Sequence, residues 1–183
     1  MQYRYATEAD APAMAELFAA NHHDALTPEQ RARQGFVQGA FDVVTLGAMA
    51  AAGELLVADD AGRVAGLLAL SVAEDMPAPP PAVAGLLQAQ DTLEWEGRPL
   101  SEVSWLLYGP VVVDAGYRGH GVARALFTMA LAAASGRADV VVAFIEAGNV
   151  ASWKAHVDGF GMTPLGDYVT GGRTYSAVAA AAS

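Results

Sequence analysis

The chain has 183 residues, 54% of them apolar, and is long enough for one compact domain over residues 1–183 that removes roughly 70% of its unfolded surface from water. Its 20 acidic and 10 basic residues give a net charge of −10, which argues against a nucleic-acid partner because phosphate neutralisation requires a basic face. The absence of cysteine excludes disulfides, thiolate metal ligands and a cysteine nucleophile.

No stretch reaches the roughly 18 to 20 consecutive apolar residues that cross a bilayer, so no membrane partner is expected. Residues 1–5 also lack the basic region and following apolar stretch of a secretory signal. A cytoplasmic location is the default expectation.

The amino-terminal segment predicts a strand over residues 2–5 and then helices. The capping oxygens of residues 7–10 precede a helix whose apolar face holds Met14, Leu17 and Phe18. Residues 28–49 have a second helical pattern. Its expected buried positions are Phe36, Val37, Phe41 and Val44.

A hairpin is predicted next, because the apolar runs 54–58 and 64–70 flank a turn cluster at residues 59–63. Residues 76–99 are then rich in proline, which fixes φ and donates no backbone hydrogen bond. We interpret them as a surface insertion with one short helix over residues 83–93.

This insertion is a candidate acceptor loop, since it comes just before the next strand. Its acidic and aromatic side chains are Asp91, Glu94, Trp95 and Glu96. Carboxylates beside an aromatic face suit a cationic amine. The plainer interpretation is a surface loop with solvated charges.

The second half alternates strands and helices. A strand is predicted over residues 103–113, with Gly109–Pro110 as an interruption. A helix follows over residues 121–135 and ends at Gly136. Residues 140–145 are apolar on both faces, as in a central strand.

The tail of the chain contains one more helix and two more strands. Asn149 is the expected cap of a short helix that runs through residue 156. Gly171–Gly172 joins the two tail strands.

The turn between the 103–113 strand and the following helix is suited to an anion. Backbone N–H groups at a helix start have no intrahelical partner, and the helix dipole adds partial positive charge. Gly119 and Gly121 lack the Cβ that would hold a phosphate away, and Arg118 and Arg124 can add charge at the rim.

Other phosphate-binding motifs fit this turn poorly. No lysine follows the glycines, as a P-loop requires, and Arg124 stands where a dinucleotide fingerprint needs its third glycine. A strand-to-helix turn that uses glycine for geometry alone is the remaining alternative.

The pattern Arg118-x-x-Gly121-x-Ala123 resembles the acetyl-CoA-binding motif of the GCN5-related N-acetyltransferases. A second similarity follows in the family's order, with Asn149, Ser152 and then Gly159–Phe160. Residues 4–10 also resemble the family's first strand and turn. The resemblance implies a single-domain α/β fold with a mixed, mostly antiparallel sheet and helices on both faces.

The resemblance also implies acetyl-CoA as co-substrate and direct acetyl transfer to an amine of a small molecule or peptide. The strand end would pair with the pantetheine arm, and the glycine turn would hold the phosphates. The implied cofactor-binding residues are Val111, Val113, Arg118, Gly119, His120, Gly121, Val122, Ala123, Asn149 and Ser152.

Several residues are candidates for the catalytic groups. Relatives carry a proton-donating tyrosine at the position of Ala155, and His156, one residue later, is the candidate acid here, with Tyr108 in reserve. Where relatives have a glutamate that acts as the general base, this chain has Trp105. Glu102 is therefore the candidate base. Glu146 and a water relay are alternatives.

Two other functions remain open: transfer of another acyl group from acyl-CoA, and non-catalytic acyl-CoA binding. His22–His23 is too close in sequence for a chelating pair, and no metal site is expected. A homodimer is compatible with the sequence.

Overall fold

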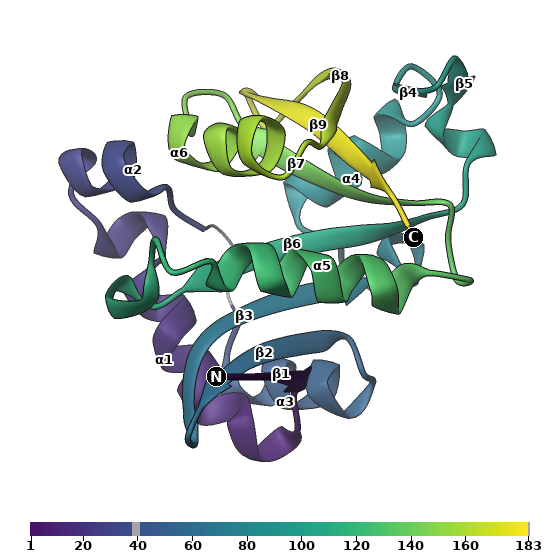
Figure 1. Cartoon of the computed structure of the whole chain (residues 1–183). Helices are drawn as coiled ribbons and strands as arrows, with labels where there is room; N and C mark the ends of the chain where they lie inside the picture. Colours follow the sequence, from purple (N-terminus) through teal and green to yellow (C-terminus); the bar gives the residue numbers. More distant parts are fainter. Residues whose placement is uncertain (38–40, 183) are drawn as a thin grey trace. The chain divides into compact units, whose positions relative to one another are not determined.

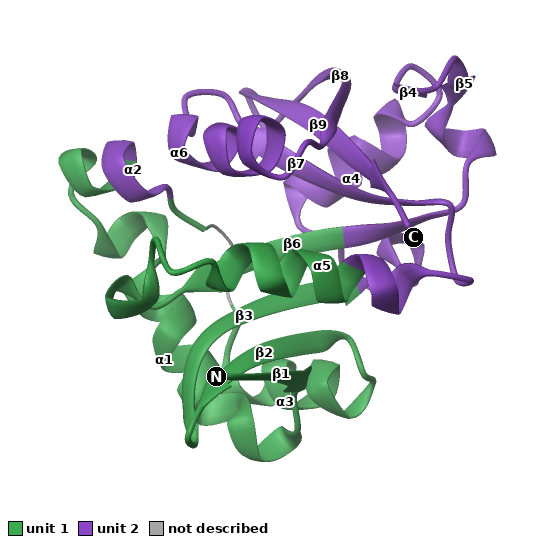
Figure 2. Cartoon of the chain, in the orientation of Figure 1, with its two compact units in different colours: residues 1–31, 36–70, 108–130 green, residues 32–35, 71–107, 131–183 purple. Residues whose placement is uncertain are grey.

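The computed structural model describes residues 1–37 and 41–182 and divides into two compact units (Figure 2). The first unit comprises residues 1–31, 36–70 and 108–130, and the second comprises residues 32–35, 71–107 and 131–183. Strand β6 (Trp105–Val113) and helix α5 (Val122–Ala134) each contribute to both units. The expectation of a single domain stays a prediction.

The first unit contains strands β1 (Gln2–Tyr5), β2 (Leu55–Asp60), β3 (Arg63–Ser71) and the carboxyl half of β6, hydrogen-bonded in that order (Figure 1). β2 pairs antiparallel with both β1 and β3. Ala61 and Gly62 form the two-residue turn between β2 and β3, with φ of 52° and 91°. Positive φ at both positions is typical of a type I′ turn, and the predicted hairpin is confirmed.

Helices cover both faces of these strands. α1 (Ala11–Ala20) and α3 (Val43–Ala51) pack on one face. The apolar cluster there includes Met14, Phe18, Leu46, Leu55, Val57 and Leu67. The start of α5 lies against the other face, where a Cβ added to Gly66 would be 3.1 Å from Val122 and 3.3 Å from Leu126. Gly66 therefore allows the helix to approach the sheet closely.

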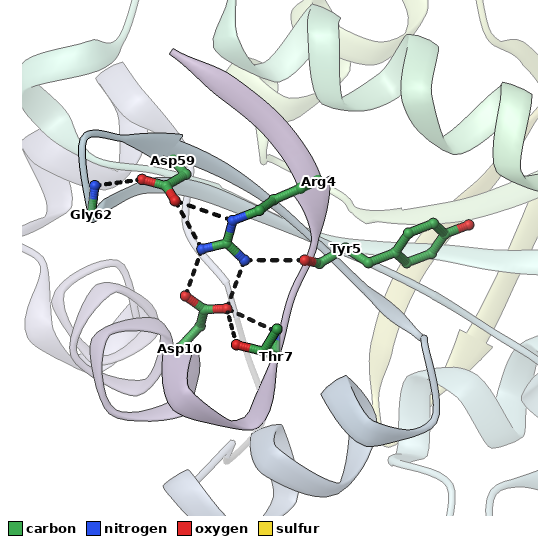
Figure 3. Close-up of polar contacts among 6 residues, drawn as sticks. All are labelled: Arg4, Tyr5, Thr7, Asp10, Asp59 and Gly62. Atoms are coloured by element: carbon green, nitrogen blue, oxygen red, sulfur yellow. Dashed lines mark hydrogen bonds and ion pairs between the residues drawn. The ribbon is translucent and has the colours of Figure 1, made fainter.

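An ion-pair network links the first strand of the chain to its neighbouring segments (Figure 3). The Arg4 guanidinium donates to Asp10 at 2.8 Å and to Asp59 at 2.9 Å, so one side chain joins β1, the 3₁₀ turn η1 (Glu8–Asp10) and β2. Hydrogen bonding by Arg4 lowers the pKa of Asp10. The pKa of Asp59 is also lowered, first by the Gly62 N–H and then by Arg4.

The region expected as one helix over residues 28–49 contains two, with residues 38–40 outside the described part of the chain. α2 (Pro28–Gln34) ends before Gly35, which has a φ of +73°. α3 begins after Asp42, whose side chain accepts from the Thr45 N–H at 2.8 Å. This cap turns Leu46 inward and leaves Val44 79% exposed. The expected burial of Val44 is therefore wrong; Phe36, Val37 and Phe41 are partly buried.

The second unit contains the amino half of β6 and strands β7 (Val140–Glu146), β9 (Arg173–Ala181) and β8 (Thr163–Thr170), in that order. β7 pairs parallel with β6, while β9 pairs antiparallel with β7 and β8. The predicted central position of β7 and the predicted Gly171–Gly172 turn are confirmed. The two units together have the mixed, mostly antiparallel α/β composition predicted from the sequence.

The proline-rich segment forms part of the second core. Its elements are η3 (Ala73–Asp75), α4 (Pro81–Ala89), β4 (Glu94–Trp95), β5 (Arg98–Pro99) and η4 (Leu100–Glu102). Val83, Leu86 and Leu93 are buried in one cluster with Val140 and Val142 of β7. The interpretation as a surface insertion is therefore wrong for these residues, because apolar side chains between the prolines cover a face of the sheet.

The remaining elements are η2 (His23–Ala25), η5 (Ala115–Tyr117), α6 (Val150–Trp153) and the π-helix η6 (Lys154–Gly159). Among the described residues, no helix is long and apolar enough to cross a membrane. The same residues contain no cluster of three or more metal-ligating His, Cys, Asp or Glu side chains.

Candidate functional site

The carboxyl end of β6 leads into the candidate binding site. Its ladder with β7 runs over three residue pairs and ends at Leu107↔Val142. Farther along, the Asp114 N–H donates to the Ala65 carbonyl of β3 at 2.9 Å. Since backbone polar groups alternate in direction along a strand, those of Val113 and Val111 point to the opposite edge of β6. These are the two strand residues predicted to meet the cofactor.

The turn after β6 has open space above its glycines. Gly119 and Gly121 have φ of 76° and 81°, and apart from each glycine and its two chain neighbours no described atom lies within 4 Å of a Cβ added there. The carbonyl of Gly121 accepts from the Ala125 N–H at 3.0 Å, so the next amides, from Val122 onward, lie in the first turn of α5. The Val122 side chain is buried, so its backbone amide is the group available to a phosphate.

The side chain of Arg118 is not at the rim of this turn. Its Nε donates to the Val113 carbonyl at 3.2 Å, and Nη2 donates to Oδ1 of Asn21. The side chain thus points back toward the end of β6 and the end of α1. Arg124 is exposed, as expected of a rim cation, and His120 Nδ1 lies 2.9 Å from the Arg118 carbonyl.

Four side chains attach the β2–β3 hairpin to the start of the turn. The Tyr117 hydroxyl donates to Asp60 at 2.7 Å, and Arg63 donates to Asp114 at 2.9 Å. Arg63 also lies over the Tyr117 ring, 5.4 Å from its centroid. Asp114 accepts from the Gly116 N–H at 2.8 Å, and this bond, followed by Arg63, lowers the pKa of the carboxyl.

In the second unit, the predicted cap of α6 is confirmed. Oδ1 of Asn149 accepts from the Ser152 N–H at 3.2 Å. Asn149 is buried, and a Cβ on Gly35 would lie 3.1 Å from its Oδ1. Asn149 therefore has a structural role here, whatever its contact with a cofactor.

His156 lies one turn beyond Ser152. Its Nδ1 is 2.9 Å from the Ser152 carbonyl and 3.2 Å from the Ser152 hydroxyl. Its ring meets Phe160 edge to face, with centroids 5.3 Å apart. Because a carbonyl only accepts, this contact favours a proton on Nδ1 and leaves the lone pair on Nε2 in the neutral ring.

A π-helical turn explains why the face of His156 was difficult to predict. The Phe160 N–H donates to the Ala155 carbonyl, five residues back, at 2.9 Å. This wider turn changes the phase that an α-helix would have, so counting back from Gly159–Phe160 does not give the face of a side chain. Counting forward from Ser152 places His156 on the same face, as their contact shows.

The environment of His156 favours the neutral imidazole. Desolvation by burial lowers its pKa from the ordinary value of 6.5, while the hydrogen bond to the Ser152 backbone acts in the opposite direction. Burial is the larger effect because taking a charged ring out of water costs more than one hydrogen bond restores.

The other catalytic candidates lie in different surroundings. Tyr108 is 2% exposed, packs edge to face with Phe127, and has a pKa raised by burial, all of which favour a packing role. Glu102 is exposed in η4, before the amino end of β6. Glu146 forms an ion pair with Arg173 at 2.8 Å.

Known structures share this fold. A ribosomal-protein-alanine N-acetyltransferase from Brucella melitensis is 22% identical, with a TM-score of 0.64 over 99% of each chain. The yncA protein from Salmonella typhimurium, solved with its cofactor acetyl-CoA, is 20% identical, with a TM-score of 0.65 over 100% of this chain and 94% of that one. An N-acetyltransferase from Staphylococcus aureus Mu50 is 18% identical, with a TM-score of 0.61 over 100% and 98%.

These likenesses define the fold as that of the acetyltransferases. No curated protein matches the sequence. The model of the acetyltransferase (GNAT) family matches residues 13–162. The chain therefore belongs to the acetyltransferase (GNAT) family, which confirms the predicted enzyme class and the use of acetyl-CoA.

Proposed function

We propose that the protein transfers an acetyl group from acetyl-CoA to a primary amine, with the phosphates held by the backbone amides from Gly119 to Ala123. The observation that carries this proposal is the open space above Gly119 and Gly121. Two glycines with positive φ, separated by His120 and placed directly before the first turn of α5, leave room for an anion where a side chain would otherwise stand.

The edge of β6 is the proposed place for the rest of the cofactor. Bound acetyl-CoA supplies the acetyl group as an activated thioester. The backbone groups of Val111 and Val113 point away from β3, and the N–H groups at such an edge can pair with an amide arm or donate to a carbonyl oxygen as charge develops on it. His120, Asn149 and Ser152 stay predictions as cofactor contacts.

His156 is the proposed proton-transfer residue. In the neutral ring Nε2 can accept a proton from the attacking amine and then return it to the departing thiolate, so no net proton is gained by the enzyme. The Ser152 carbonyl at 2.9 Å from Nδ1 supports this direction of transfer, because it orients the ring. Tyr108 and Glu102 stay predictions.

Titration with acetyl-CoA, followed by a thiol-release assay over a panel of amines, tests the function. We expect heat of binding and amine-dependent release of CoA. Binding without release over the panel would favour the non-catalytic module, and faster release from a longer acyl-CoA would favour the other acyltransferase. Absence of binding to any acyl-CoA would reject the proposal.

Carboxylates at and before the β4–β5 hairpin are the candidates for recognition of the acceptor amine. The β4–β5 hairpin presents exposed carboxylates at Glu94 and Glu96, and Asp91, which precedes β4, is exposed as well. Trp95 is partly buried against the second core. The carboxylates suit a cationic amine, although the Trp95 face is partly used for packing. A cytoplasmic location and a homodimer also stay predictions.

A further inference from the structure

We propose that Arg118 is a positioning residue, which sets the glycine turn by linking it to the ends of β6 and α1, and is not a phosphate ligand. This inference rests on the proposed acetyl-CoA site. Arg118 directly precedes Gly119, and its guanidinium donates to the Val113 carbonyl and to Asn21 Oδ1. The Arg118 guanidinium is therefore directed toward the ends of β6 and α1.

The acceptor Asn21, which directly follows α1, is held in place by several hydrogen bonds. Asn21 is 8% exposed, and its Nδ2 donates to the Leu17 carbonyl at 2.8 Å. Its backbone N–H donates to the Phe18 carbonyl at 3.0 Å, and its own carbonyl accepts from the Val37 N–H at 3.1 Å. With these bonds in place, Oδ1 is a fixed point against which the guanidinium can orient the turn.

The chemistry of arginine fits this task. A guanidinium presents several donors in one rigid plane, so it can hold two acceptors at a set angle, whereas a lysine ammonium is a flexible point charge. One side chain thereby joins three segments: the last residue of β6, the residue that directly follows α1, and the first residue of the turn over residues 118–123, here called the phosphate turn. Loss of the link should let the amides at Gly119 and Gly121 move out of register with a bound phosphate.

The test distinguishes a positioning role of Arg118 from a direct phosphate contact. It compares a variant that keeps the positive charge with variants that remove the hydrogen bonds. Isothermal titration with acetyl-CoA is carried out on Arg118→Ala, Arg118→Lys, Asn21→Ala and the double variant Arg118→Ala/Asn21→Ala. We expect each to raise Kd about tenfold, the size of one lost charge-assisted hydrogen bond, with the double variant no worse than either single one. Asn21→Asp keeps the acceptor and should bind within about threefold of the wild type.

Arg31→Ala is the matched control. Arg31 also joins two acceptors with one guanidinium, the His23 and Leu26 carbonyls at 3.0 and 2.9 Å, and within the described part of the chain these acceptors lie outside the turn. Its loss should lower the melting temperature and leave Kd unchanged. An equal rise in Kd for Arg31→Ala would mean general loosening and would overturn the proposal.

Other results would overturn it as well. Wild-type affinity for acetyl-CoA in Arg118→Lys or in Asn21→Ala would do so. So would a rise in Kd for Asn21→Asp equal to that for Asn21→Ala, or a rise in Kd for the double variant that equals the product of the two single rises. If the wild type binds no acetyl-CoA, the proposed function fails instead. The link is then judged by thermal unfolding, where additive losses of Tm in the double variant would refute it.

Discussion

Gly121 has a backbone conformation that side chains disfavour, and the space above it is open. We predict that Gly121→Val weakens acetyl-CoA binding at least tenfold, about 1.4 kcal/mol, because the branched side chain would fill the space proposed for phosphate. Isothermal titration measures the change. Gly136→Val is the control, since Gly136 has a similar φ of +73° and equally open surroundings at the end of α5. Equal losses of affinity in the two variants would contradict the prediction.

His156 permits a prediction about turnover. His156→Phe keeps the ring packed against Phe160 and removes the proton carrier, so kcat should fall roughly 10²- to 10⁴-fold with little change in acetyl-CoA affinity. Steady-state kinetics and titration check the two parts. His23→Phe, which removes an imidazole from η2, should retain wild-type kcat. An unchanged kcat in His156→Phe would exclude this residue as the proton carrier.

The pH profile of the wild type follows from the same residue. The neutral ring is the active form, and burial lowers its pKa below 6.5. The rate should therefore fall on the acid side only below pH 6.5, as His156 becomes protonated. This acid limb should be absent from the residual activity of His156→Phe.

The glycine turn between β6 and α5 was predictable because its signal is local, with glycines and a helix start within a few residues. The Asn21 partner of Arg118 was not predictable, since the two are 97 residues apart in sequence. A sequence pattern reports that an arginine is charged, but not where its guanidinium points. For this reason the sequence led us to expect the Arg118 guanidinium at the rim of the turn, whereas in the structure it binds the Val113 carbonyl and Asn21.

At the scale of elements, the Arg4 network should contribute measurably to stability. We predict that Arg4→Met lowers the free energy of unfolding by about 2 kcal/mol at pH 7, because it removes charge-assisted hydrogen bonds to two partly buried carboxylates. Urea unfolding measures the loss. Arg173→Met, which breaks the more exposed pair with Glu146, is the control and should cost under about 1 kcal/mol.

The sign of the pH dependence is fixed by the carboxylates. Asp10 and Asp59 have pKa values below their ordinary 3.8 in the folded protein, so their contribution is complete above the unfolded pKa and is lost as pH falls through the folded value. The difference between Arg4→Met and the wild type should therefore shrink below about pH 4. A difference that grows toward pH 3 would contradict the assignment.

The elements that were predicted correctly have short-range signals. The hairpin has its turn residues between two apolar runs, and α5 has a glycine at each end. The break between α2 and α3 was missed because the apolar pattern continues through it. The π-turn after Trp153 was missed because its hydrogen bonds, not its composition, distinguish it from an α-helix. The role of residues 76–99 depends on which side chains they meet.

For the whole molecule, we predict a single cooperative unfolding transition. β6 contributes Val112 to the core of the first unit and Leu107 to the core of the second, so unfolding of either unit removes a strand from the other. Scanning calorimetry should give equal calorimetric and van't Hoff enthalpies. Two separable transitions would instead identify the units as independent domains.

We expect the two-residue turn at Ala61–Gly62 to tolerate few insertions among natural variants of this protein. Surface turns usually tolerate insertions. Here the residues on either side, Asp60 and Arg63, contact Tyr117 and Asp114 at 2.7 and 2.9 Å. One added residue would change the turn type and shift both side chains relative to the phosphate turn. We therefore expect the length of this turn to be held constant by selection for acetyl-CoA binding, even though its two residues are exposed.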